Sequence, residues 1–312
     1  MSSRLCLCRA LFFRRNILKT GCLYFITDLF YEKFDNDETL MKNKEAINGQ
    51  NHDRPCFFAI RDVKDKEIYW LVPLSSKVDK YEAIVNKKVQ KMIEKGKEKP
   101  ECNTIRFGEV LGNKTVFLIQ NMFPTTSKYI KNVYIDKNTN NNVTLPPDVT
   151  SDIIKNAKQV LKLHKRGINL TYGNIDTIYS ALCEELKKDR NTLAALKSVL
   201  HQHEEILRLN PELNKNYQQA AKCVMKYNPE MKREMLIDTE LSINEQLNIA
   251  LALRNECNKV ILSDSQLKQD YIAAKKIYLE NISKQKTQIE NKSVVNTVKD
   301  NNHTNRSKKP SL

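Results

Sequence analysis

The chain has 312 residues, 40% of them hydrophobic, and a formal charge of +15, so it can hold two domains and its excess of cations suits an anionic partner. Its mean hydropathy is −0.56, and no apolar run approaches the roughly 18 to 20 residues of a membrane span, which argues against a membrane protein and predicts a cytoplasmic one. The eight cysteines form no C-x-x-C unit, so the sequence predicts neither a zinc site nor a disulfide framework, and no cofactor.

Residues 1–22 form a basic N-terminal extension, with five Arg or Lys and no acidic residue. The segment has only a short apolar stretch and lacks the continuous hydrophobic core of a secretory signal. An unstructured extension and a start codon placed too far upstream both account for this composition, and an organelle transit peptide shares it. The folded part of the chain is expected to begin at about Leu23.

The following part, up to Val133, is expected to consist mainly of strands, because runs rich in β-branched and aromatic residues alternate with polar turns. The short, mostly polar segment Val63-Lys64-Asp65-Lys66 predicts one tight hairpin. Gly112 beside Asn113 predicts a second, because both residue types tolerate positive φ. The predicted strands are 23–28, 55–62, 67–74, 104–112 and 114–121.

Three amphipathic helices are predicted among and after these strands. Residues 79–95 repeat apolar side chains at helical spacing, and 77–99 carries eight lysines against four acidic residues. A second helix is expected to begin at Pro146-Pro147 and to end at Gly167, with five Lys or Arg and no acid across 154–166. A third follows near 175–186. This mixture of short strands and helices is typical of an α+β fold.

From residue 188 to 283 the sequence predicts an all-helical C-terminal extension of four to five helices. Asn210-Pro211 and Asn228-Pro229 each predict a helix start, with Asn at the N-cap and Pro at the first helical position. Ser242 and Ser263 begin capping boxes that predict two further starts. Residues 284–312 are polar and basic, which predicts a disordered tail.

The strand predicted at 67–74 stops at Ser75-Ser76-Lys77, which offers two hydroxyls and an ammonium group. Such a cluster suits the oxygens of a phosphate. RNA is cleaved without metal when the ribose 2′-OH attacks the neighbouring phosphorus, which requires acid–base chemistry and positive charge near the developing phosphorane. The strand end is therefore a candidate catalytic site, and the alternative is an ordinary strand-terminal turn.

The strand end belongs to one of four sequence blocks that together form a recognisable pattern. They are Tyr24-Phe25-Ile26, Asn51-His52-Asp53-Arg54-Pro55, Pro73 to Tyr81 and Val116 to Pro124. Together they resemble the toxin endoribonucleases of type III toxin–antitoxin systems, the ToxN/AbiQ and CptN group, over residues 23–187. The resemblance implies a compact antiparallel sheet flanked by helices and a metal-independent endoribonuclease domain.

The resemblance also implies candidate catalytic residues. Ser76 matches the essential serine of the family, and Ser75 matches the hydroxyl residue before it. The family's lysine lies two residues after the serine, where this chain has Val78, so Lys77 or Lys80 has to replace it. The family's N-terminal tyrosine aligns with Phe30, and the neighbouring Tyr31 is the candidate for its role.

A second set of residues is predicted to contact RNA, because cations and hydrogen-bonding side chains stand in or near the family blocks and on the two basic helices. For Gln120 a base contact and a strand cap are equally plausible. For His52, an acid–base role competes with that of a solvated loop histidine. For His164-Lys165-Arg166 at the end of a basic helix, a functional role and the favourable helix dipole have equal weight. His203 is expected to pack. The predicted RNA contacts are Tyr24, Arg54, Lys80, Lys87, Lys88, Lys91, Gln120, Lys158, Lys162 and Arg166.

By this resemblance the chain is expected to be a type III toxin that cleaves RNA to a 2′,3′-cyclic phosphate. A small structured RNA antitoxin, made from tandem repeats, would inhibit it, and family members often assemble with such RNA in closed rings. The alternative is a non-catalytic nucleic-acid-binding or protein-interaction protein of a mobile genetic element.

Overall fold

The structure, a computed structural model, describes residues 18–47, 50–224 and 241–304. It contains two compact units. The first takes in the described residues up to Arg190 and a short stretch that ends at Asn244, and the second takes in the described residues from Asn191 to Val224 and from Glu245 onward. The α+β class predicted from the sequence is confirmed.

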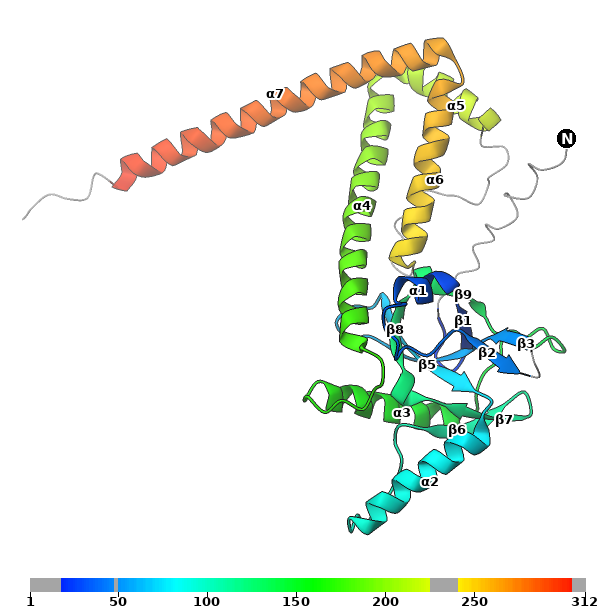
Figure 1. The fold of residues 1–312 in the computed structure, drawn as a ribbon. Coiled ribbons are helices and arrows are strands. Elements are labelled where there is room, and N and C mark those ends of the chain that lie inside the picture. The colour runs from blue at the N-terminus through cyan, green and yellow to red at the C-terminus, as the bar shows by residue number, and fades with distance from the viewer. Residues whose placement is uncertain (1–17, 48–49, 225–240, 305–312) are drawn as a thin grey trace, which may run out of the picture. The chain divides into compact units, whose positions relative to one another are not determined.

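The first unit is built on an antiparallel sheet of seven strands with the order β6-β7-β5-β4-β1-β9, and β8 pairs with the first half of β5 (Figure 1). A separate hairpin joins β2 (Lys44–Ile47) to β3 (Gln50–Asp53). The strands of the sheet are β1 (Leu23–Ile26), β4 (Cys56–Arg61), β5 (Ile68–Ser75), β6 (Arg106–Val110), β7 (Asn113–Phe117), β8 (Phe123–Thr126) and β9 (Ile130–Val133).

Both predicted hairpins are present, since β4 pairs with β5 and β6 with β7. At the second turn the positive φ falls on Leu111 (50°) and Gly112 (76°) rather than on Asn113. The strand predicted at 114–121 ends at Phe117, and a 3₁₀ turn, η1 (Ile119–Asn121), follows it. Two hydrogen bonds form this turn, from the N–H of Asn121 to the carbonyl of Leu118 at 2.9 Å and from that of Met122 to Ile119 at 3.1 Å. The N–H of Gln120 bonds the carbonyl of Thr104, 3.0 Å away.

β5 is the central strand, and all eight of its residues are buried. Its alternate side chains enter two hydrophobic cores, with Leu71 on one face of the sheet and Val72 and Leu74 on the other. A strand that is covered on both faces reads as a continuous apolar run, which is why the sequence shows it so clearly.

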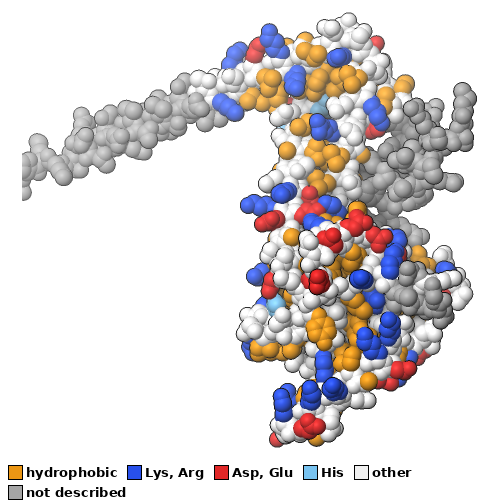
Figure 2. All heavy atoms as spheres, in the orientation of Figure 1, with side chains coloured by type: hydrophobic (Ala, Val, Ile, Leu, Met, Phe, Trp, Pro, Cys, Tyr) orange, Lys and Arg blue, Asp and Glu red, His pale blue; other side chains and the backbone are white. Residues whose placement is uncertain are grey.

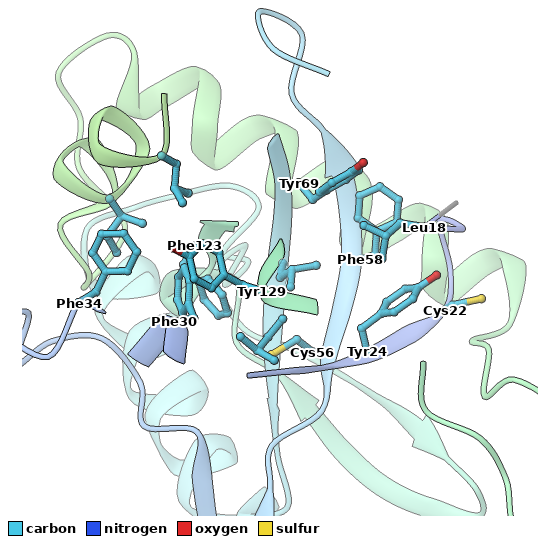
Figure 3. Close-up of a cluster of buried hydrophobic side chains, with 14 residues drawn as sticks. Leu18, Cys22, Tyr24, Phe30, Phe34, Cys56, Phe58, Tyr69, Phe123 and Tyr129 are labelled. Atoms are coloured by element: carbon cyan, nitrogen blue, oxygen red, sulfur yellow. The ribbon is translucent and has the colours of Figure 1, made fainter. Parts of the chain in front are cut away.

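Each face of the sheet has its own cover. On the first face, α1 (Asp28–Lys33) places Phe30 against Phe123 and Tyr129, and the early part of α4 (Ile175–Leu209) adds Ile178 (Figure 3). On the second face, α3 (Pro147–His164) packs its buried side chains on β4 and η1. Gly167, at φ 82°, follows the end of α3 as predicted.

α2 (Val78–Glu94) follows β5 and packs beside β7. Its apolar side is half-buried against the cluster around Ile105 and Val116, and none of its residues is fully buried. The helix therefore holds to the sheet along one side and exposes the other, as its periodicity predicts.

Glu185, near the start of α4, accepts hydrogen bonds from Lys33, Lys128 and Tyr129, the last at 2.8 Å. Burial of the Glu185 carboxyl raises its pKa, but these hydrogen bonds outweigh burial and hold that pKa below its usual range. The cluster ties α4 to α1 and to η2 (Ser127–Tyr129), the 3₁₀ turn that follows β8.

We expect Glu185→Gln to destabilise the first unit by about 1–3 kcal/mol at neutral pH, because charge-assisted hydrogen bonds are lost. A depressed pKa in the folded state gives stability that is full above the unfolded pKa and is lost as the pH falls through the folded value. The difference between the two proteins should therefore shrink on acidification below about pH 4. Trp70, the one tryptophan of the sequence, reports unfolding of this unit by fluorescence. An equal difference at pH 7 and pH 3 would contradict the assignment.

The second unit contains the remainder of α4 with α5 (Pro211–Val224), most of α6 (Ile243–Leu262) and α7 (Ser265–Thr304). The predicted cap is present, since the side chain of Asn210 accepts from the N–H of Leu213 at 3.0 Å. At α7 the cap is Asp264, which accepts from the N–H of Leu267 at 2.8 Å, and not Ser263. The start predicted at Asn228 lies outside the described residues.

The tail predicted to be disordered begins at residue 284, whereas α7 extends as a helix to Thr304. The predicted boundary at 187/188 lies inside α4. In the core of the second unit, His203 packs between Tyr217 and Tyr271, and its Nδ1 lies 3.1 Å from the Tyr271 hydroxyl, in keeping with the packing role expected for it. No helix in the described ranges has the length and apolar character needed to cross a bilayer.

Candidate active site at the end of strand β5

β5 ends at Ser75, whose backbone pairs with Val116 of β7. Ser75 is buried, at 2% exposed, while Ser76 and Lys77 are exposed. The N–H of Lys77 donates to Oγ of Ser75 at 3.3 Å, and α2 starts at the next residue, Val78. The chain thus passes from a buried strand to a helix within two exposed residues, which carry one hydroxyl and one ammonium group.

The start of α2 adds partial positive charge to the same place. The first N–H groups of a helix lack partners within the helix, and the macrodipole favours anions there. The N–H of Val78 bonds back to the carbonyl of Ser76 at 2.9 Å, which keeps the turn tight. A phosphate at this point would meet the hydroxyl of Ser76, the ammonium of Lys77 and the helix N-terminus together.

Arg54 is buried next to the turn at Ser75 and Ser76, and it does not lie on the surface. Its side chain is 6% exposed, and the guanidinium donates to the carbonyl of Leu74 at 2.5 Å and to that of Lys42 at 3.1 Å. The predicted phosphate contact is therefore not available in this structure. Arg54 instead fixes the backbone next to Ser75, which makes it a positioning residue.

Of the two candidate tyrosines, Tyr24 is buried, and Tyr31 is half-buried with its hydroxyl in the interior. Burial raises the pKa of Tyr31 well above its ordinary value, and its ring packs on Phe30 and Phe123 at centroid distances of 5.4 and 6.3 Å. Tyr24 is 6% exposed, its hydroxyl accepts from the N–H of Lys19 at 2.7 Å, and burial raises its pKa to about 12. Neither hydroxyl is exposed enough to contact RNA, so neither tyrosine remains a candidate for direct RNA binding.

The lysines of α2 divide into two groups. Lys80, Lys87 and Lys91 are exposed, and spacings of seven and four residues place them on one side of the helix. Lys88 instead donates to Thr104 at 3.1 Å and to Gln120 at 2.9 Å. Gln120 is 2% exposed, so these two predicted RNA contacts bind each other. Figure 2 shows Lys and Arg side chains gathered along α2.

The predicted residues of α3 lie on a different part of the first unit. Lys158 and Lys162 line a cavity of about 260 Å³ together with Arg61 and Trp70. Arg166 is exposed just beyond the helix. His164 Nε2 lies 2.9 Å from the carboxylate of Asp176, so a hydrogen-bond partner accounts for its position. Residues of α3 and of the β4–β5 hairpin line this basic cavity.

His52 is exposed on β3 and lines a larger cavity that the sequence did not indicate. Phe25 and Tyr134, which stand in separate segments of the chain, also line it. Nothing local in the sequence distinguishes these two aromatic residues from core residues, because it is the pairing of β1 with β9 that brings them together.

The cysteines at 22, 56, 102, 183, 223 and 257 are free thiols. Burial raises the pKa of the Cys56 thiol to about 12. Across the described ranges, no group of three or more His, Cys, Asp or Glu side chains is arranged to hold a metal ion.

No protein family model and no curated protein sequence matches the chain. Two solved structures share part of the fold. One is AbiQ, a lactococcal anti-phage endoribonuclease belonging to a type III toxin–antitoxin system, with 13% identity over 54% of this chain and 99% of AbiQ, and a TM-score of 0.39. The other comes from work on a processed non-coding RNA that regulates a bacterial antiviral system, with 11% identity over 51% of this chain and 95% of that chain, and a TM-score of 0.36. These likenesses are distant and assign no activity by themselves.

Proposed function

We propose that the chain is an endoribonuclease toxin of the type III kind and that it cuts RNA at the end of β5. The observation that carries the proposal is the exposed pair Ser76-Lys77, which lies between a buried strand and the N-terminus of a basic helix. The serine stands at the position that matches the family's essential serine. A hydroxyl donor, an ammonium group and a helix N-terminus at one point suit a phosphate better than any other common group.

In the proposed reaction the ribose 2′-oxygen forms a bond to phosphorus as the bond from phosphorus to the 5′-oxygen breaks. The 2′-OH gives up its proton, the leaving 5′-oxygen gains one, and the products are a 2′,3′-cyclic phosphate and a 5′-hydroxyl. Ser76 would donate to a non-bridging phosphate oxygen, and Lys77 would stabilise the charge that develops there. Ser75 and Arg54 would hold the turn in position.

Lys80 remains the alternative for the role of the family lysine. Its ammonium lies 5.6 Å from the centre of the Tyr81 ring, in the first turn of α2. Tyr31, the remaining predicted catalytic residue, would act only indirectly, through packing and through its neighbours Cys56 and Arg54.

The inhibiting partner is proposed to be a small folded RNA, recognised through its phosphates and through unpaired bases. The exposed cations offer two surfaces for it, Lys80, Lys87 and Lys91 on α2 and Lys158, Lys162 and Arg166 at α3. A molecule with two separate RNA-binding surfaces can link successive RNA units, which is what a closed ring of protein and RNA requires.

A binding protein without turnover is the second candidate. The observation that favours it is the burial of Ser75 and the partial burial of Tyr31, which leave Ser76 and Lys77 as the exposed residues of the predicted catalytic set. Such a protein would keep the basic surfaces and bind RNA without cutting it.

Expression with and without the DNA directly upstream of the gene separates these functions. The chain induced alone should arrest growth, and co-transcribed upstream repeats should restore it. Ser76→Ala should be harmless in both settings. If the wild-type chain and Ser76→Ala are equally harmless when no RNA inhibitor is present, the toxin proposal is wrong.

A further inference from the structure

A cavity of about 890 Å³ opens on the first unit. Pro55 lines it, and the carbonyl of Pro55 accepts a hydrogen bond from the N–H of Leu74 at 3.1 Å, two residues before Ser76. Pro55, just before β4, therefore connects the lining of the cavity to the last residues of β5. Its volume lies within the range of about 300 to 1,000 Å³ that is typical of ligand pockets.

Two aromatic rings form part of the lining. Phe25 is on β1 and Tyr134 follows β9, and their centroids lie 5.1 Å apart at an angle of 59°. The N–H of Tyr134 donates to the carbonyl of Leu23 at 2.8 Å, so the sheet fixes its backbone. Both rings are half-buried, which leaves part of each surface open to the cavity. Rings held in this way can stack with a planar ligand.

Amide groups and cations surround the rings. Asn132, Asn140 and Lys137 line the cavity and are exposed. Asn140 takes a φ of 56°, and its N–H donates to the carbonyl of Asp136 at 2.8 Å, so this turn has a defined shape. Amides can read the hydrogen-bonding edge of a base, and a lysine can hold a phosphate.

The carboxylate in the lining does not make the cavity acidic. Asp53 accepts from Lys131 at 2.7 Å and also from Lys44, and these hydrogen bonds hold its pKa below the usual range. With Asp53 matched by two ammonium groups, Lys137 and His52 set the local charge, which is neutral to positive. An anionic ligand therefore meets no net repulsion.

We propose that this cavity binds an unstacked nucleotide of single-stranded RNA adjacent to the cleaved phosphate, with the base against Phe25 and Tyr134 and its phosphate near Lys137. The proposal rests on the proposed function, because it makes the cavity a subsite for the same RNA. Single-stranded RNA is commonly recognised by splayed bases on aromatic side chains, and stacking is tolerant of base identity.

The test measures binding of a short single-stranded RNA with 2-aminopurine at successive positions, using full-length Ser76→Ala protein so that the RNA stays intact. Stacking on the rings should quench the fluorophore at one position. Adding Tyr134→Leu should weaken binding by about 5- to 150-fold and remove that quenching, the range expected for one lost stacked base. Tyr134→Phe should retain both, because the ring remains.

Tyr172→Leu is the matched control, since Tyr172 is 56% exposed elsewhere on the same unit and should leave binding and quenching unchanged. Trp70 fluorescence checks that each variant is folded. Unchanged affinity and quenching in Tyr134→Leu, or no binding of the RNA by the Ser76→Ala protein, would overturn the subsite. A failure of the proposed function would give a different result: the RNA would bind and the fluorophore would be quenched, but the wild-type chain would not cleave the RNA.

Discussion

Ser76→Ala is expected to lower the rate of RNA cleavage by about 100- to 1,000-fold and to leave the affinity for RNA almost unchanged. The hydroxyl of Ser76 is proposed to donate to the phosphate oxygen on which charge develops, and loss of one such donor costs a factor of this size in comparable sites. Because the interaction strengthens in the transition state, its removal affects turnover more than binding.

Two variants make this result specific. Ser76→Thr retains a hydroxyl at the same place and should keep most of the activity. Ser151→Ala removes another exposed hydroxyl, which donates to the carbonyl of Pro147 in α3, and should have no effect on cleavage. A Ser76→Ala protein that cleaves at more than half the wild-type rate would remove Ser76 from the mechanism.

Replacing Lys80, Lys87 and Lys91 together by Gln is expected to weaken RNA binding by about 10- to 100-fold at 0.1 M salt, because three phosphate contacts are lost. The slope of log affinity against log salt should fall in magnitude by about 2, at roughly 0.7 for each contact with a single strand. Binding measured at several salt concentrations gives both quantities.

The control removes the same charge from another part of the chain. Lys268, Lys275 and Lys276 are exposed on α7, and their replacement by Gln should leave the slope unchanged if the α2 face carries the contacts. Lys88 is excluded from the test set, because its bonds to Thr104 and Gln120 make any change there a change in packing. An unchanged slope in the α2 variant would move the RNA path to Lys158, Lys162 and Arg166.

The central elements of the fold could be predicted because their patterns are local. β5 is a run of apolar residues that ends at two serines, and α2 repeats its apolar side chains at helical spacing. The four-residue strands β2, β3, β8 and β9 are too short to show a period, and they exist because partner strands lie beside them. Sequence periodicity cannot indicate such strands.

The candidate site was predictable only in part, because the exposure of a side chain also depends on segments that are distant in the sequence. Ser76 and Lys77 are exposed because the strand ends there, which a local pattern shows. Whether a cation or a tyrosine faces solvent depends on what packs over it. The guanidinium of Arg54 could bind a phosphate, yet it donates to the carbonyl of Leu74 instead. Tyr31 packs its ring on Phe30 and Phe123.

The most direct test of the account maps the ends of the RNA fragments that the purified full-length protein produces in the presence of EDTA. Attack by the ribose hydroxyl predicts fragments with a 2′,3′-cyclic phosphate and a 5′-hydroxyl, formed by the wild-type chain and not by Ser76→Ala. Cleavage that EDTA abolishes and magnesium restores, with 3′-hydroxyl ends, would contradict the proposed chemistry at the end of β5.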